Sequence, residues 1–224
     1  MASTTTRRSP VRPPNRSKRT GLLRAAIVAG VVAVLAAVFF AILSSQPTTP
    51  AESGGASDAG YTVGSPAPGS EAPAFSLPST SGETVNLSDY RGKTVLLCFH
   101  EGIGCQPCWD QIKDLDGSQA QLQAAGIDQL LTITSGPVDL IAQKMADDQL
   151  TATALADTKL DISRTYQTNK YGMMGDSRNG HSFILVGPDG RIEWRADYGG
   201  SPKYTMYVPV DTLLSDLEAG RAVQ

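Results

Sequence analysis

The sequence predicts an α/β domain with a mixed central sheet flanked by helices, placed after an N-terminal transmembrane helix. Three observations lead to this prediction. An uncharged apolar run covers residues 25–43. From residue 73 onward, short apolar runs alternate with segments of helical pattern, which is typical of a sheet covered by helices. The chain then ends in a hairpin and a helix, so the sheet must combine parallel and antiparallel strands.

The first 24 residues are strongly basic. They carry seven Lys and Arg side chains and no acidic one, so the rest of the chain holds 12 basic side chains against all 22 acidic ones. Binding to nucleic acid phosphates needs clustered positive charge, and the acidic body therefore argues against a nucleic acid partner. The basic tail is better explained by the apolar run that follows it.

Residues 25–43 are long enough to cross a membrane as a helix. At about 1.5 Å per residue, the run covers roughly 28 Å, close to the hydrocarbon thickness of a bilayer. The positive-inside rule then places residues 1–24 in the cytoplasm and the C-terminal body outside, in a single-pass cell membrane protein. A cleaved signal peptide is the alternative, although no Ala-x-Ala site follows the run. Residues 44–72 are rich in Ser, Pro, Gly and Ala, which predicts a flexible linker.

The predicted domain covers residues 73–222, and its first half contains two apolar strands. A short extended segment at 84–87 precedes the apolar run 94–99, which suits a buried central strand. A helix over 106–125 is ended by Gly126, and residues 127–134 form the second strand. Pro137 suits the first turn of a helix that runs to about residue 148.

The second half of the domain ends in a hairpin. A weak strand at 152–156 and a short helix at 158–167 come first. Strands at 181–186 and 191–196 flank Gly187-Pro188-Asp189-Gly190, a strong hairpin signal because glycine supplies positive φ. A helix over 209–219 closes the domain.

Cys105 and Cys108 follow the buried strand directly and stand at the start of the next predicted helix. This spacing brings the two sulfurs close enough for a disulfide without large strain. A helix N-terminus offers unpaired N–H groups and a partial positive charge, which stabilise a thiolate. We expect Cys105 to be the attacking nucleophile and Cys108 to resolve the mixed disulfide. Pro107 is compatible with this position because the first turn of a helix needs no N–H at that point.

Other uses of a Cys-x-x-Cys pair fit less well. A structural zinc site needs a second pair of ligands, and the sequence offers only Cys98 and two histidines. A c-type haem site needs His after Cys108, where Trp109 stands. A purely structural disulfide would close so short a loop that it would stabilise the fold little. The pair therefore indicates redox or metal-binding chemistry.

The motifs around this pair resemble those of the redoxin superfamily, which includes TlpA-like membrane-anchored thioredoxins and peroxiredoxins of the AhpC/TSA type. The resemblance covers about residues 64–220, and the Cys-x-Pro-Cys form followed by Trp is similar to the thioredoxin branch. It implies a thioredoxin fold and a dithiol/disulfide activity. The matching segments are 69–75, 87–93, 95–99, 105–108, 156–157 and 183–192.

Two departures from the thioredoxin pattern matter for the chemistry. Thioredoxins carry a cis-proline just before the strand that faces the cysteines, and here that place reads Gly180-His181-Ser182-Phe183. Thioredoxins also often bury an Asp where this sequence has Cys98. Glu101 and His100 are therefore the candidate proton acceptors for Cys108, and Cys98 is expected to be an inert core residue.

A thiol peroxidase is one alternative function. In peroxiredoxins a Thr or Ser stands three residues before the peroxidatic Cys, and an Arg from a later strand helps to polarise the peroxide. Here Gly102 stands at the first of these places. No Arg immediately precedes Phe183, and Arg178 is close but displaced.

Copper binding is the second alternative. Two thiolates and an imidazole suit Cu(I), so Cys105, Cys108 and His181 form a candidate ligand set. This set loosely resembles that of the Sco copper chaperones, which have three residues between their cysteines rather than two. Met173 and Met174 are expected in a loop that covers the site rather than as further ligands.

The sequence thus predicts a membrane-anchored extracytoplasmic thiol–disulfide oxidoreductase that acts on exported cysteine-containing proteins. No nicotinamide or flavin signature is present, so no cofactor is expected, and copper enters only in the alternative. Electrons would then come from another protein, such as a membrane thiol carrier. The central Gln106-Pro107 dipeptide does not indicate whether the pair reduces or oxidises its substrate.

Overall fold

The computed structural model describes residues 60–222. The predicted basic tail (1–24), the predicted transmembrane helix (25–43) and the first part of the predicted linker lie outside the described residues. Within residues 60–222, no helix has both the length and the apolar character needed to cross a bilayer.

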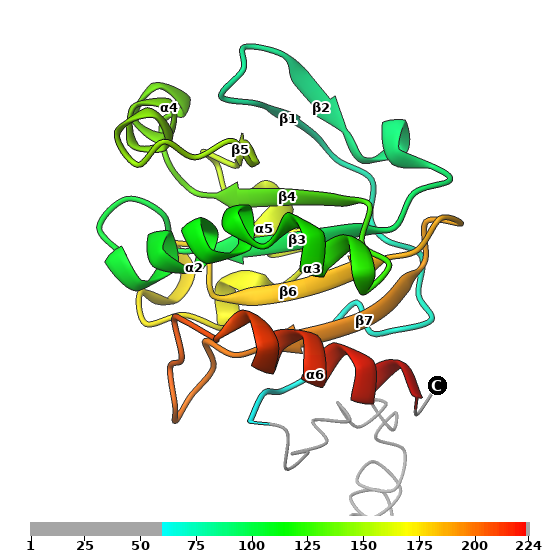
Figure 1. The fold of residues 1–224 in the computed structure, drawn as a ribbon. Helices are drawn as coiled ribbons and strands as arrows, with labels where there is room; N and C mark the ends of the chain where they lie inside the picture. Colours follow the sequence, from blue (N-terminus) through cyan, green and yellow to red (C-terminus); the bar gives the residue numbers. More distant parts are fainter. Residues whose placement is uncertain (1–59, 223–224) are drawn as a thin grey trace, which may run out of the picture. The chain divides into compact units, whose positions relative to one another are not determined.

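A five-stranded mixed sheet forms the centre of the domain, in the order β5-β4-β3-β6-β7 (Figure 1). The central strand β3 (Val95–His100) runs parallel to β4 (Gln129–Thr134), which runs parallel to β5 (Thr153–Ala156). On its other side β3 pairs antiparallel with β6 (Ser182–Val186), and β6 pairs antiparallel with β7 (Ile192–Asp197). The predicted mixed sheet and its terminal hairpin are confirmed.

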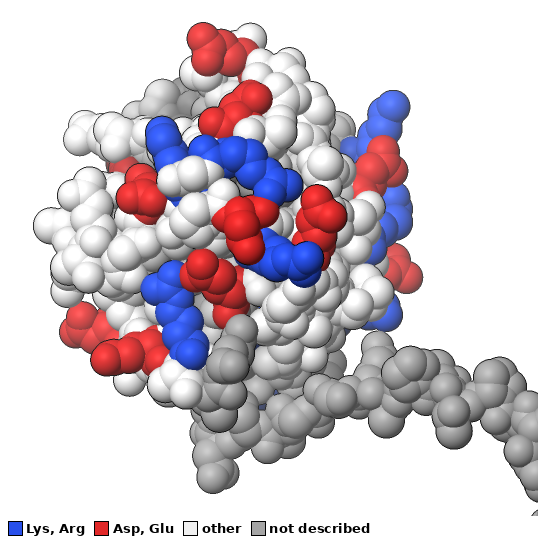
Figure 2. All heavy atoms as spheres, turned by 90° about the vertical axis from the view of Figure 1, so that its right-hand side faces the viewer, with Lys and Arg blue, Asp and Glu red and all other residues white. Residues whose placement is uncertain are grey.

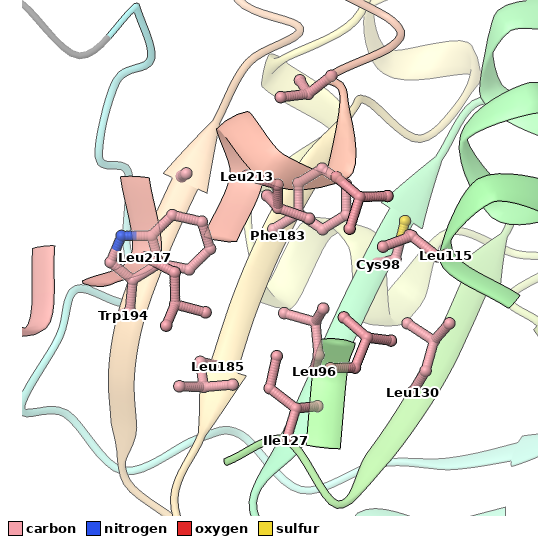
Figure 3. Packing of buried hydrophobic residues seen from close by; sticks show 14 of the residues in the cluster. Leu96, Cys98, Leu115, Ile127, Leu130, Phe183, Leu185, Trp194, Leu213 and Leu217 are labelled. Atoms are coloured by element: carbon pink, nitrogen blue, oxygen red, sulfur yellow. The ribbon is translucent and has the colours of Figure 1, made fainter. Parts of the chain in front are cut away.

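One face of the sheet is covered by α2 (Gln106–Gly117), α3 (Gln119–Ala124) and α6 (Val210–Ala222), which lie in front of it in Figure 1. Leu96 and Cys98 of β3 pack there against Leu115 of α2, and Figure 3 shows Cys98 beside Leu115. At the β5 edge, α4 (Val138–Asp147) forms a smaller apolar cluster with Trp109 of α2. This face, which we call the α2 face, also carries the chemistry described below.

The other face is covered by α5 (Asp161–Thr165), by the hairpin of β1 (Ser76–Pro78) and β2 (Thr84–Asn86), and by the 3-10 turn η1 (Leu87–Tyr90). Two further 3-10 turns, η2 (Thr168–Lys170) and η3 (Gly175–Ser177), lead from α5 toward β6. The side chains of β3 that point to this face are all apolar, so β3 is buried on both sides.

Three elements differ from the prediction. The helix expected over 106–125 is divided at Ser118, whose ψ of 23° interrupts the helical path between α2 and α3. The helix expected over 158–167 is reduced to α5, because Leu160 and Gln167 adopt left-handed φ on either side of it. Strand β1 was not predicted, since a three-residue strand has too few positions to show an alternating pattern.

Residues 60–72 pack against the sheet, although they fall within the predicted linker. The backbone of Thr62 pairs with Asp197 of β7, and Glu71 pairs with Arg191. Ala72 is buried. The contacts of the domain therefore begin ahead of the predicted boundary at residue 73.

Candidate active site

Cys105 and Cys108 form a disulfide at the start of α2, with their Cα atoms 5.3 Å apart. Cys105 is the N-cap residue, and its carbonyl oxygen accepts the N–H groups of Cys108 and Trp109. Pro107 lies in the first turn, where its missing N–H costs no helical hydrogen bond. The strand β3 ends at His100, so the short loop 101–104 delivers the pair to the carboxyl end of the sheet, on the left in Figure 1.

The two cysteines differ in their access to solvent. Cys105 retains 7% of its surface, whereas Cys108 is fully buried. Met206 packs against both and forms a small apolar cluster with them. Cys105 is thus the cysteine of the pair that is nearer to solvent.

The loop before Cys105 approaches β4 very closely at Gly102. A Cβ built on Gly102 would lie 2.1 Å from Oγ1 of Thr134, and the residue has a φ of +80°. The Gly102 carbonyl accepts hydrogen bonds from the Cys105 N–H (3.0 Å) and from Nε1 of Trp109 (3.2 Å). Glycine is therefore required at this position, and its backbone fixes the direction in which Cys105 is presented.

A second loop, residues 171–179, lies over loop 101–104. The Met173 N–H donates to Oε1 of Glu101 at 2.7 Å. The guanidinium of Arg178 donates to the Ile103 carbonyl at 2.6 Å. Met173 and Met174 are 60% and 52% exposed. The predicted covering loop is thus present beside the site, held by Glu101 and Arg178, with its methionines facing solvent.

The two histidines of the chain are both fully buried: His100 ends β3, and His181 immediately precedes β6. The antiparallel register pairs Phe99 with Ser182, so the next pair along is His100 and His181. Neither imidazole has a hydrogen-bonding partner among the described residues. Burial lowers the pKa of each to about 3, and the neighbouring His181 adds to this effect on His100. Both rings are therefore neutral at physiological pH.

Cys98 lies one row deeper on the same face and is free. Its side chain is fully buried among apolar residues, and this burial raises the pKa of its thiol. A thiol that stays protonated is a poor nucleophile. The expectation of an inert core cysteine agrees with this environment.

With this geometry in view, the chain can be compared with known proteins. The model of the AhpC/TSA family matches residues 68–195, more than half of the chain. The chain belongs to the AhpC/TSA family. Peroxiredoxin Bcp of Escherichia coli is 31% identical over 128 residues, which cover 56% of this chain and 81% of the relative. A putative peroxiredoxin of Mycobacterium tuberculosis is 30% identical over 130 residues, with the same coverage of 56% and 81%.

Solved structures show that this AhpC/TSA protein has the mixed α/β thioredoxin-like fold. Peroxidoxin BcpB from Mycobacterium tuberculosis matches with a TM-score of 0.56 and 17% identity, covering 68% of this chain and 96% of that one. A putative thiol:disulfide interchange protein DsbE from Chlorobium tepidum matches with a TM-score of 0.51 and 24% identity, covering 69% and 97%. The family relationship makes the chain a thiol oxidoreductase of the redoxin type.

The structure brings some of the predicted site residues of this AhpC/TSA protein together. Glu101 and His100 adjoin the cysteine loop as predicted, and the carboxylate of Glu101 is engaged by the covering loop. His181, expected to be a strand-end residue and named as a copper ligand only in the alternative, lies beside His100, next to the Phe99–Ser182 pair. Within residues 60–222, no three His, Cys, Asp or Glu side chains are grouped as a metal site requires.

Three contributors were missed from the sequence: Thr134, Met206 and the Arg178 contact with Ile103. Thr134 could have been found, because it ends a predicted strand next to the cysteine strand. Met206 and the Arg178 contact depend on loops whose paths carry no sequence pattern.

The end of the domain opposite the disulfide has mixed charge. Figure 2 shows this end, which is the right-hand side of Figure 1, with Lys and Arg side chains lying among Asp and Glu. An extended basic surface, which nucleic acid binding would use, is not visible on this face.

Proposed function

We propose that this protein is a thiol–disulfide oxidoreductase, in which Cys105 exchanges with a partner and Cys108 resolves. The observation that carries this proposal is the disulfide at the start of α2, in which Cys105 is 7% exposed and Cys108 is fully buried. The helix start stabilises a Cys105 thiolate, which is the attacking species in disulfide exchange.

The exchange proceeds in two displacements. The Cys105 thiolate attacks one sulfur of a partner disulfide, breaks that S–S bond and releases a partner thiolate. Cys108 then loses its proton and attacks the Cys105 sulfur, which forms the intramolecular disulfide and releases the second thiolate. Two electrons pass from the pair to the partner, and the one proton released is that of Cys108. The reverse sequence oxidises a partner dithiol.

The setting of this activity follows from the sequence. We propose that residues 25–43 anchor the chain in the cell membrane, with residues 1–24 in the cytoplasm and the thioredoxin-like domain outside. Its partners would then be exported cysteine-containing proteins and a membrane thiol carrier. The dithiol itself carries the electrons, so the proposal includes no cofactor.

A peroxidase is the second candidate, favoured by membership in the AhpC/TSA family and by relatives named peroxiredoxin. Against it, Gly102 cannot be replaced by Thr without meeting Thr134, so the hydroxyl expected three residues before a peroxidatic cysteine has no room. Arg178 reaches the loop before Cys105 but donates to a backbone carbonyl there.

One experiment separates these functions. The full chain, purified in detergent and reduced, is mixed with a disulfide-bonded model protein or with hydrogen peroxide, and the second-order rate of Cys105–Cys108 disulfide formation is measured for each. We expect the protein disulfide to react faster, and both reactions to require Cys105. A faster reaction with peroxide would identify a peroxidase.

A parallel sample receives Cu(I) alone. Retention of stoichiometric copper that depends on His181, without exchange with either oxidant, would favour the copper alternative and overturn the oxidoreductase.

A further inference from the structure

The carboxyl end of the sheet carries a row of buried polar side chains on the α2 face. The register pairs His100 of β3 with Thr134 of β4, and His181, the residue before β6, lies next to the Phe99–Ser182 pair on the other side of β3. All three are fully buried. Neither the four imidazole nitrogens nor Oγ1 of Thr134 has a hydrogen-bonding partner within residues 60–222. Buried polar atoms normally have partners, so five such atoms without one in a single row call for a function.

Helix and strand geometry place this row near Cys108, at the start of α2. Helix α2 runs back over β3, and Leu115 of α2 packs beside Cys98, as Figure 3 shows. Cys108 precedes Leu115 by about 10 Å along the helix, at 1.5 Å per residue. His100 lies about 7 Å beyond Cys98 along the strand in the same direction. Cys108 and His100 therefore stand at a similar level along the sheet. The next residue of α2 agrees with this, because the centroids of the Trp109 and His100 rings are 5.2 Å apart.

We propose that His100 and His181 form a buried imidazole pair that hydrogen-bonds the Cys108 sulfur when the disulfide is reduced, holds its proton during resolution and so stabilises the reduced protein. This inference rests on the proposed dithiol exchange and names the groups that serve its resolving step. In the disulfide form the two imidazoles have no anion beside them. Reduction supplies one, the thiolate of Cys108.

The imidazole pair carries the one proton that the resolving step moves. As Cys108 attacks the Cys105 sulfur of a mixed disulfide, its proton moves to an imidazole nitrogen and the partner thiolate leaves. The proton then passes to that thiolate, and both imidazoles are neutral again. A neutral imidazole has one N–H donor and one acceptor nitrogen, so each ring can both hold the thiolate and accept its proton. A thiolate beside the rings raises their pKa from the low value of the disulfide form, because opposite charges favour each other.

The other titratable groups around the row are already engaged or remote from the sulfur. The Glu101 carboxylate accepts the Met173 N–H, and the Tyr198 hydroxyl donates to Asp216. The Cys98 thiol lies one row deeper. Of the cations on adjoining elements, Arg178 donates to the Ile103 carbonyl and Lys144 lies over the Trp109 ring. Arg195 pairs with Asp197, and Lys113 is exposed.

The test uses variants that keep the packing. His100→Phe and His181→Phe, singly and together, retain an aromatic ring in place of each imidazole, and Cys98→Val in the next row is the matched control. Adding Cys105→Ala isolates the Cys108 thiol, and its pKa is read from ultraviolet thiolate absorbance. The equilibrium constant with glutathione is measured in the variants that keep both cysteines.

We expect each Phe variant to raise the Cys108 pKa by at least one unit and the double variant to raise it further. The glutathione equilibrium should shift at least tenfold toward the disulfide, which corresponds to a potential about 30 mV lower. Cys98→Val should change neither quantity. Folded Phe variants with an unchanged thiol pKa and equilibrium constant would overturn the imidazole pair, while a wild-type pair that never exchanges with dithiols would overturn the proposed function instead.

Discussion

Oγ1 of Thr134 occupies the space that a side chain on Gly102 would need, at a distance of 2.1 Å from the ideal Cβ. This contact joins the loop that presents Cys105 to the end of β4. It also leaves no room for a hydroxyl-bearing side chain at the position of Gly102.

The Gly102→Thr variant should therefore lose stability and gain no peroxide reactivity. Left-handed φ and the collision with Thr134 together should cost about 2–5 kcal/mol. Urea denaturation measures the cost, and Gly92→Thr is the control, because Gly92 has a φ of +82° with nothing within 4 Å of its Cβ. The control should lose only about 1–2 kcal/mol. Equal losses of stability in the two variants would show that Thr134 moves aside at little cost.

The two cysteines should behave differently when each is replaced alone. Cys108→Ser should accumulate mixed disulfides through Cys105, because the attacking sulfur remains and the resolving one is gone. Cys105→Ser should accumulate none, since Cys108 is fully buried. Non-reducing electrophoresis after mixing with a disulfide-bonded protein measures the adducts. Adducts formed mainly through Cys108 would reverse the assigned roles.

The loop 171–179 should loosen when its anchor to Ile103 is removed. Arg178→Ala loses the hydrogen bond to the Ile103 carbonyl, so amide hydrogen exchange should become faster in this loop and in residues 101–104. Arg164→Ala is the control, since that side chain is 53% exposed and pairs only on the surface. Unchanged exchange in Arg178→Ala would show that Glu101 and Met173 hold the loop alone.

The buried histidines should make the fold weaker in acid. Their folded pKa of about 3 lies below the usual 6.5, so between these values the unfolded chain binds more protons. Stability is then fully present above about pH 6.5 and is lost as the pH falls, by about 1.4 kcal/mol per pH unit for each histidine. Denaturant unfolding of the disulfide form measures this slope. The double His→Phe variant should flatten it, and an unchanged slope would assign acid sensitivity to carboxylates.

The face of the sheet opposite the α2 face contains a buried ion pair between Arg195 and Asp197. Neither side chain has exposed surface. Asp197→Ala should cost about 3–5 kcal/mol, because it leaves a buried guanidinium uncompensated. Urea denaturation of the disulfide form checks this value. Asp161→Ala, which breaks a surface pair, should cost less than about 1 kcal/mol. A similar small loss for Asp197 would show that the guanidinium finds another partner.

The buried strands, the hairpin at 187–190 and the start of the cysteine helix could be predicted because each has a local cause. Apolar runs mark buried strands, and the glycines of the turn allow its geometry, with Gly190 at a φ of +80°. The division of the long helix at Ser118 was missed, although Gly117, a poor helix former, stands directly before it.

The site was predicted in its parts but not in its assembly. Cys105, Cys108, His100 and Glu101 were identified because they follow a recognisable strand. The opposition of His100 and His181 depends on the register of β3 and β6, which are separated by some eighty residues of chain and whose pairing no local pattern fixes. The same holds for Met206, which reaches the cysteines from the segment before α6.

The disulfide closes a ring of only four residues inside one turn of one helix. No distant segments are tied together by it, so we expect the domain to keep the same outline whether the ring is open or closed. A pair built in this way can be oxidised and reduced repeatedly without a change of fold. Under the proposed exchange, a partner would then distinguish the oxidised from the reduced protein only at the start of α2, where the disulfide lies.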